Sequence, residues 1–384
     1  MDIMTTMRDC SPPILLVGES YHNADMYYAT GFLAPDRFVY ICKDDEERIL
    51  VSQMEYERAK KESRVKWVHS LEEYGYTEKL RTVKDPDVAL ADTLAAMLSS
   101  LKVKTVRVPK DFPLLMGDML RARGVEVVPA SKLFEEARSV KSPDEIEKIK
   151  KAQAVNEKAM ARALDIIKKS KARNGTLYYG GRQLTSEFLQ REIEMEFISN
   201  GYDANDTIVA SGPRSADPHF AGEGAIKENE PIVIDIFPYG KKDRYFADMT
   251  RTVVKGTPSP DIRKMYDVVL EAQNLALNAI RAGVTGKQVN DLVCDYFEKQ
   301  GYGTIRTKSV DGFIHSTGHG VGLEIHEHPS IGEAGIEPLK PGQVVTVEPG
   351  LYRPGVGGVR IEDMVVVTED GNVNLTKFPK KLVI

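Results

Sequence analysis

The feature that most constrains the fold is a repeat in the C-terminal two thirds of the chain. Ser142 and Pro143 begin one long helical pattern, and Ser259 and Pro260 begin another, 117 positions after Ser142. Serine caps a helix, and proline fits its first position. Glu145 completes a capping box with Ser142. We therefore expect long helices at equivalent places in two similar halves.

Each long helix is followed by the same kinds of elements. A second helical pattern comes next, TSEFLQREIEMEFISNG in the first half and KQVNDLVCDYFEKQG in the second. Apolar strands follow and carry two acidic residues per half: Asp235 and Asp248 are thirteen positions apart, and Glu348 and Glu362 are fourteen apart. Residues 140–384 are thus predicted to form two halves, each a helix pair plus a β-hairpin with two carboxylates.

Two of these carboxylates lie in strongly apolar surroundings. Asp235 is within PIVIDIF and Glu348 is within VVTVEPG, and both patterns predict buried strands. A buried carboxylate is costly unless it is paired or bound to a cation. One such residue alone is more often a turn or surface residue. Four at matched spacing would repel one another, which indicates a divalent metal.

Residues 315–329, HSTGHGVGLEIHEHP, hold four of the seven histidines. The segment is not the helical zinc motif HExxH, because its glycines disfavour a helix and its histidines have the wrong spacing. We expect extended backbone, on which His326, His328 and Glu324 share one face and Glu327 lies on the other. Not all of these side chains can therefore be metal ligands.

The first part of the chain has a different pattern. From residue 13 to residue 140, apolar runs alternate with a helical pattern, DVALADTLAAMLSSL, which predicts an α/β domain. The predicted strands are ILLVG, RFVYICK, RILVSQ, VKTVRVPK and VEVVPA. Because the long helix starts at Ser142, we place the boundary just before it, with domains at 1–139 and 140–384.

The amino-acid composition argues against some classes of binding partner. The net charge of −5 argues against nucleic acid, and no apolar run approaches a membrane span. Cys10, Cys42 and Cys294 lie far apart and have no metal-type spacing. We therefore expect no disulfide framework and a reducing compartment, the cytoplasm.

Five motifs in order, PHF, DIF…ADMTRT, GHGVGLEIHE, VEPG and RIED, resemble the pita-bread metallopeptidases. That family includes proline dipeptidase (prolidase), aminopeptidase P and methionine aminopeptidase. YYATGF and LVSQMEYERAKKES also resemble the N-terminal domain of the proline-specific branch. The resemblance implies an α/β N-terminal domain followed by an α+β pita-bread catalytic domain with internal pseudo-two-fold symmetry.

The resemblance also implies a site for two divalent ions. Its ligands would be Asp235, Asp248, His319, Glu348 and Glu362, with Asp248 and Glu362 as bridges. Such an oxygen-rich set favours manganese, although cobalt, iron and zinc are also compatible. One departure concerns the first aspartate motif, which is usually Asp-x-Gly in the family but ends in Phe237 here.

Further site residues follow from the resemblance. Glu348 would be the general base, and His326 or His219 would stabilise the oxyanion. His315 matches another active-site position. For Arg360, orienting the substrate or Glu362 and forming a cross-strand ion pair are equally favoured interpretations. His328 matches no assignable position and is expected to be an exposed loop residue.

The expected function is that of an Xaa-Pro dipeptidase, with aminopeptidase P as the alternative. Some dipeptidases of the family hold the substrate carboxylate with an arginine after the HE motif, where this chain offers only Lys340. Arg360, Arg353 or Arg214 would have to substitute. A metal-free creatinase-like hydrolase and a non-catalytic protein-binding module are alternatives of other classes, and the intact ligand set argues against both. The resemblance further implies a homodimer.

Overall fold

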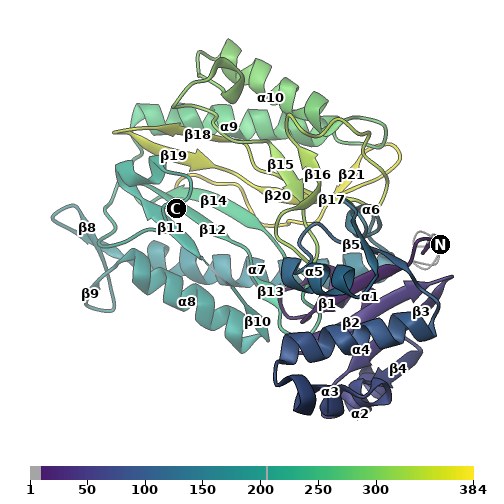
Figure 1. Cartoon of the computed structure of the whole chain (residues 1–384). Coiled ribbons are helices and arrows are strands. Elements are labelled where there is room, and N and C mark those ends of the chain that lie inside the picture. Colours follow the sequence, from purple (N-terminus) through teal and green to yellow (C-terminus); the bar gives the residue numbers. More distant parts are fainter. Residues whose placement is uncertain (1–9, 205) are drawn as a thin grey trace. The chain divides into compact units, whose positions relative to one another are not determined.

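The structure is a computed structural model that describes residues 10–204 and 206–384. The chain separates into two compact units, the first ending at Arg138 and the second spanning Ser139–Ile384 (Figure 1). Each unit has its own sheets and apolar core.

The first unit is built on a six-stranded sheet with the order β4-β3-β2-β1-β5-β6. All five predicted strands are present, and β4 is an additional short one. The strands are β1 (Ile14–Gly18), β2 (Phe38–Lys43), β3 (Glu46–Val51), β4 (Trp67–Ser70), β5 (Thr105–Val108) and β6 (Glu126–Pro129). The helices are α1 (Ala24–Thr30), α2 (Tyr56–Glu62), α3 (Tyr76–Val83), α4 (Pro86–Ser100), α5 (Leu114–Ala122) and α6 (Glu135–Ser139), with a 3-10 turn η2 (Leu71–Tyr74).

Helix α4 is the one that the sequence predicted in this unit. Asp85 caps it by accepting from the backbone N–H groups of Asp87 and Val88, and Pro86 takes the first turn. Leu94 and its buried neighbours pack on the apolar side chains of β1, β2 and β5. The unit is therefore α/β, as expected.

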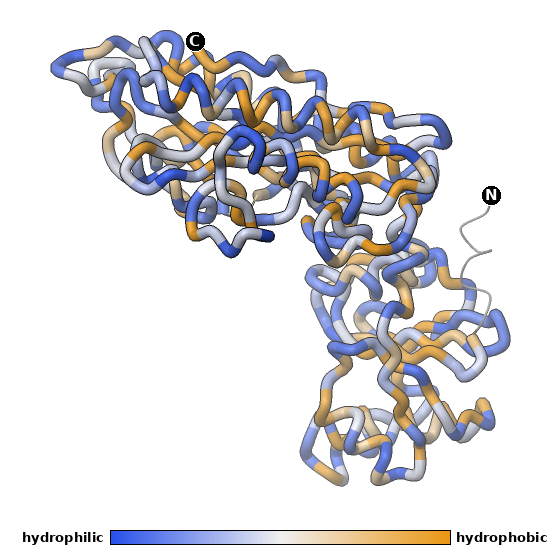
Figure 2. Tube along the Cα trace, turned by 90° about the horizontal axis from the view of Figure 1, so that it is seen from above, coloured by the Kyte–Doolittle hydropathy of each residue, from blue (hydrophilic) through white to orange (hydrophobic). Residues whose placement is uncertain are grey.

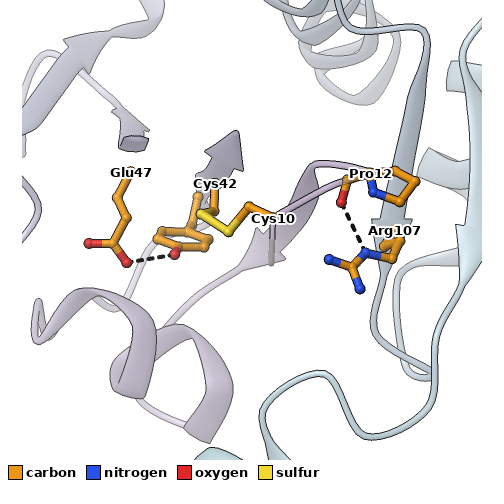
Figure 3. The surroundings of a disulfide bond; sticks show 6 residues. Cys10, Pro12, Cys42, Glu47 and Arg107 are labelled. Atoms are coloured by element: carbon orange, nitrogen blue, oxygen red, sulfur yellow. Dashed lines mark hydrogen bonds between the residues drawn. A yellow bond between two sulfur atoms is a disulfide. The ribbon is translucent and has the colours of Figure 1, made fainter. Parts of the chain in front are cut away.

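No disulfide framework was expected, but Cys10 and Cys42 are joined by a disulfide (Figure 3). The antiparallel pairing of β1 with β2 places Ile14 opposite Cys42, so the segment before β1 lies beside the end of β2. Strand pairing thus brings together two cysteines that are 32 residues apart in the sequence. The argument for a reducing compartment from cysteine spacing loses its support.

The second unit contains the predicted helices at the predicted places. They are α7 (Pro143–Lys169), α8 (Ser186–Ser199), α9 (Pro260–Ala279) and α10 (Gly286–Lys299). The capping box of Ser142 and Glu145 is present, and the Ser259 side chain accepts from Ile262 N–H. The cap signals in the sequence therefore located both long helices correctly.

The carboxylate-bearing strands also form as antiparallel pairs, β12 with β14 and β17 with β20. The first half has the sheet β11 (Ile208–Ser211), β12 (Pro231–Ile236), β14 (Met249–Val254). The second has β16 (Glu327–Ile331), β15 (Gly318–Gly320), β17 (Val344–Val347), β20 (Asp363–Val367), β21 (Asn372–Asn374), beside the pair β18 (Gly350–Arg353) and β19 (Gly357–Arg360). Smaller elements are β7 (Lys171–Arg173), β8 (Thr176–Tyr179), β9 (Arg182–Gln183), β10 (Tyr202–Asp203), β13 (Tyr239–Gly240), η3 (Gly212–Ala216) and η4 (Ile305–Thr307).

The two halves bury separate apolar clusters. One lies between α7, α8 and the first sheet, and the other between α9, α10 and the second. Figure 1 shows the two helix pairs on opposite sides of the strands, as the predicted internal symmetry requires. Hydrophobic and hydrophilic residues are interleaved along the chain (Figure 2). Within residues 10–204 and 206–384, no helix has the length and apolarity needed to cross a membrane.

The expectation of continuous extended backbone through residues 315–329 is wrong. Strands β15 and β16 are separated by a turn at residues 321–326, and their register shifts between His319 and Gly320. Because His326 lies in the turn, the alternation rule does not assign its face. The six-residue loop at residues 321–326 is what the simple period-two argument missed.

Candidate metal centre

Four acidic side chains converge because of where they stand on the two strand pairs. Asp235 is the fifth residue of β12, and Asp248 immediately precedes β14. Glu348 directly follows β17, and Glu362 directly precedes β20. All four line one cavity of about 780 Å³, together with His319.

His319 is placed by two glycines on β15. A Cβ on Gly318 would run into the backbone oxygen of Thr346, and one on Gly320 into that of His328. Only glycine permits these close backbone approaches. The backbone N–H of His319 donates to Thr346 Oγ1 at 3.1 Å, which further fixes the strand.

The orientation of the His319 ring leaves one nitrogen facing the acidic groups. Nδ1 lies 3.1 Å from the backbone oxygen of Gly320, an acceptor, so Nδ1 carries a proton. Nε2 lies 3.1 Å from Glu348 Oε1 and 3.7 Å from Asp248 Oδ2. In the neutral tautomer this Nε2 has a free lone pair, as a metal ligand needs.

Several atoms are arranged as a cation would require. Asp248, His319 and Glu362 each offer one ligand atom within 4.8 Å of the others. Asp235 Oδ1 and Glu362 Oε1 are buried and lack a hydrogen-bond donor in the described part of the chain. Since buried anionic oxygens are costly without a partner, the residues present fit a bound cation.

The proton affinities of the acidic groups support the same interpretation. Burial and the charge of Asp235 raise the pKa of Asp248 well above its usual range. Burial and the charge of Asp248 likewise raise the pKa of Glu362 well above its usual range. Without a cation, these carboxylates would therefore keep protons to limit their mutual repulsion.

His319 and Glu348 behave as an ion pair when no cation is present. Burial alone would lower the pKa of His319, but the hydrogen bond to Glu348 and the charges of Glu348 and Asp248 raise it to about 9. Burial alone would raise the pKa of Glu348, but the hydrogen bond and charge of His319 lower it to about 2. Glu348 is therefore ionised at neutral pH.

Arg360 is buried at the end of β19, and its guanidinium contacts three side chains. It donates to Asp235 Oδ2 at 2.6 Å, to Tyr352 Oη at 2.6 Å and to Thr250 Oγ1 at 3.2 Å. Its ionic partner is thus Asp235, a predicted ligand on another sheet, and not Glu362. Glu362 instead accepts from Thr250 Oγ1 at 2.8 Å.

The other predicted histidines differ in their surroundings. His315 lies with Nδ1 at 2.7 Å from Ser316 O and Nε2 at 2.9 Å from Tyr352 Oη, and burial lowers its pKa. The His326 ring lies 4.3 Å from the His319 ring, centroid to centroid. His326, His315 and the exposed His219 all line the cavity.

The cavity also has apolar walls that sequence reasoning did not find. They come mostly from residues next to the motifs, and Phe237 is the position at which the chain departs from Asp-x-Gly. That departure was the only sequence signal for these walls. The apolar lining residues are Ile208, Pro218, Ala221, Phe237, Ile314 and Ile325.

Comparisons with known proteins find similar families and relatives over nearly the whole chain. Residues 147–369 match the model for metallopeptidase family M24, and residues 15–140 match the creatinase/prolidase N-terminal domain. An Xaa-Pro dipeptidase of Pyrococcus furiosus is 35% identical over 93% of this chain and 92% of its own.

Solved structures show the same likeness. An Xaa-Pro dipeptidase from Bacillus anthracis has a TM-score of 0.84 and 29% identity, covering 100% of this chain and 99% of that one. An X-Pro aminopeptidase from Thermotoga maritima has a TM-score of 0.79 and 29% identity, covering 97% of each chain. The likeness therefore includes both kinds of proline-specific exopeptidase.

Proposed function

The chain belongs to metallopeptidase family M24, and from this premise we propose that it hydrolyses the bond between an N-terminal residue and a following proline, chiefly in dipeptides. The observation that carries the proposal is the convergence of four carboxylates and His319 in one cavity with apolar walls. Full-length relatives named Xaa-Pro dipeptidase support the same activity.

We propose that Asp235, Asp248, His319, Glu348 and Glu362 hold two divalent ions. Two unpartnered buried carboxylate oxygens support this set, and so does the Nε2 of His319, which faces Glu348 and Asp248 while Nδ1 contacts Gly320 O. When bound, such ions supply Lewis acidity and lower the pKa of water. Manganese is the ion we expect, since oxygen donors predominate.

The chain's own groups would carry the proton and charge movements. Glu348 is ionised at neutral pH, and we propose it as the proton acceptor, the role that the family resemblance implies. His326 and His219 lie at the cavity, where an imidazole N–H can donate to an oxyanion. Arg360 orients Asp235 through a charge-assisted hydrogen bond.

Proline selectivity follows from what the cavity walls offer. An Xaa-Pro bond has no N–H to donate, so apolar walls suit the pyrrolidine ring and leave no donor unsatisfied. Ile314 and Ile325, on either side of the His315–His319 segment, and Phe237 provide such walls.

The sequence predicts that Arg360, Arg353 or Arg214 holds a dipeptide's carboxylate. Each arginine that could substitute already has a partner: Arg360 with Asp235, Arg353 with Asp261 at 3.6 Å, and Arg214 with Glu223. A guanidinium keeps further N–H donors beside such a pair, so a substrate carboxylate would bind at one of these or displace the present partner. Aminopeptidase P activity on longer peptides therefore remains the alternative.

One assay separates the alternatives. The metal-reconstituted protein is given Leu-Pro, Leu-Pro-Gly and Leu-Gly under the same conditions, and we expect Leu-Pro to be hydrolysed fastest. Rapid cleavage of Leu-Pro-Gly would identify an aminopeptidase, whereas Leu-Gly cleaved as fast as Leu-Pro would reject proline selectivity. No cleavage of any peptide, with no metal bound, would support the binding-module alternative.

We also expect a homodimer, as the resemblance implies. Light scattering at micromolar concentration measures the mass directly. A monomer would reject the dimer without affecting the catalytic proposal.

A further inference from the structure

Gln273 lies in α9, and its side chain is fully buried. Its amide nitrogen donates to the backbone oxygens of Val347 at 2.9 Å and Ile361 at 3.0 Å. Each of these carbonyls belongs to the residue just before a predicted ligand, Glu348 in one case and Glu362 in the other. One side chain therefore links the backbones of two ligand-bearing segments.

The Gln273 side chain connects the two segments just beyond the end of the hydrogen-bond ladder between β17 and β20. The last pair between β17 and β20 is Val347 with Asp363, so Glu348 and Glu362 both lie outside the ladder. Beyond that point, ladder hydrogen bonds no longer fix the distance between the two segments. Gln273 supplies the missing connection, because its amide bridges both carbonyls.

The other half contains an amide in the equivalent place. Asn156 in α7 precedes Gln273 by 117 positions, the spacing that also separates the two helix starts. It is fully buried, and its amide nitrogen donates to Ile236 O at 2.9 Å. Ile236 follows Asp235 and forms, with Met249, the last pair of the β12–β14 ladder before Asp248.

We propose that Gln273 and Asn156 are positioning residues that hold the four carboxylates at the spacing needed for tight metal binding. The proposal rests on the metal-binding part of the function proposed above. Like charges on these segments push them apart. The Gln273 amide opposes that separation beyond the end of the β17–β20 ladder, and the Asn156 amide anchors the last pair of the β12–β14 ladder to α7. Partners behind metal ligands of this kind typically change metal affinity about 10–100-fold when removed.

The test is to titrate the chelator-treated full-length protein with Mn²⁺ and to measure the binding affinity by calorimetry. Gln273→Met keeps the length and volume of the side chain but removes the donor. We expect it to weaken Mn²⁺ binding by about 10–100-fold. Asn156→Leu loses one hydrogen bond to the ligand segments and should also weaken Mn²⁺ binding. If Gln273→Met does not fold, the result for Asn156→Leu decides the question.

Two control variants separate positioning from general destabilisation. Asn372 donates its amide to Leu277 O at 2.6 Å and Ile280 O at 3.0 Å, away from the predicted ligands, so Asn372→Leu loses a comparable pair of bonds. Tyr266→Phe removes a buried hydroxyl on the same helix that has no partner among the described residues. Both should bind Mn²⁺ as the wild type does.

The outcomes distinguish the inference from the function on which it rests. If the wild type binds Mn²⁺ and a folded Gln273→Met or Asn156→Leu protein binds it equally well, the positioning role is wrong. Equal weakening in Asn372→Leu would also reject it, because the effect would then be one of stability. If the wild type binds no Mn²⁺, the metal-binding function itself fails.

Discussion

Arg360 and Asp235 form a buried ion pair in which guanidinium nitrogen and carboxylate oxygen are 2.6 Å apart. The same guanidinium reaches Tyr352 and Thr250, so it connects strands of both halves at the predicted ligand. Lysine offers one point charge and cannot reproduce this fork. We expect Arg360→Lys to lower kcat for Leu-Pro about 10–100-fold.

Arg162→Lys is the matched control, because Arg162 forms an exposed ion pair with Glu192 at 2.6 Å, away from the cavity. Such surface pairs contribute little, and activity should hardly change. An Arg360→Lys enzyme with wild-type kcat would show that the fork is dispensable.

His326 and His219 are expected to act on the substrate and not on the metal. Removing one oxyanion donor typically costs about 10²–10³-fold in kcat. His326→Ala and His219→Ala should therefore lose turnover while calorimetry still shows Mn²⁺ binding. His328 is exposed as expected, although it lies in β16 and not in a loop, and it has no assigned role, so His328→Ala should retain activity. A His326→Ala or His219→Ala protein that no longer binds metal would make the residue a ligand.

The pH dependence of metal binding follows from His319, whose pKa in the metal-free protein is raised to about 9 by Glu348 and Asp248, against the effect of burial. Below that pH the imidazole is protonated, and the proton must leave before Nε2 can bind a metal. Raising the pH from 6 to 9 should thus increase Mn²⁺ affinity. Calorimetry at pH 7 in buffers of different ionisation enthalpy should reveal proton release, and a buffer-independent heat would argue against it.

The disulfide of Cys10 and Cys42 is testable by counting thiols. Under denaturing conditions without reductant, alkylation should modify Cys294 alone, and after reduction it should modify all three cysteines. Mass spectrometry reads the number directly. Three modified thiols before reduction would show that the protein is isolated in the reduced form.

Local signals were sufficient for α4, for the four helices α7, α8, α9 and α10, and for the placing of the acidic strands. Ser142 and Ser259 act on the next few residues, so their capping could be predicted from sequence. The acidic positions followed from the apolar strands around them, because burial makes an isolated carboxylate improbable.

Other features depend on contacts between distant segments. Cys10 and Cys42 meet through strand pairing, and the bonds of Gln273 to Val347 and Ile361 require the helix to cross both segments. Arg360 could be interpreted in two ways until its partner was known. No local pattern encodes such contacts, although the 117-residue repeat could have drawn attention to Asn156 and Gln273.

The most direct test of the dinuclear site is the metal content of the wild type and of Asp248→Ala after reconstitution with Mn²⁺ and removal of free ion. Asp248 is predicted to bridge the two ions, so its loss should affect both metal content and hydrolysis. We expect about two equivalents per chain and Leu-Pro hydrolysis for the wild type. Asp248→Ala should retain at most one equivalent and lose activity. Two equivalents and wild-type hydrolysis in Asp248→Ala would contradict the account.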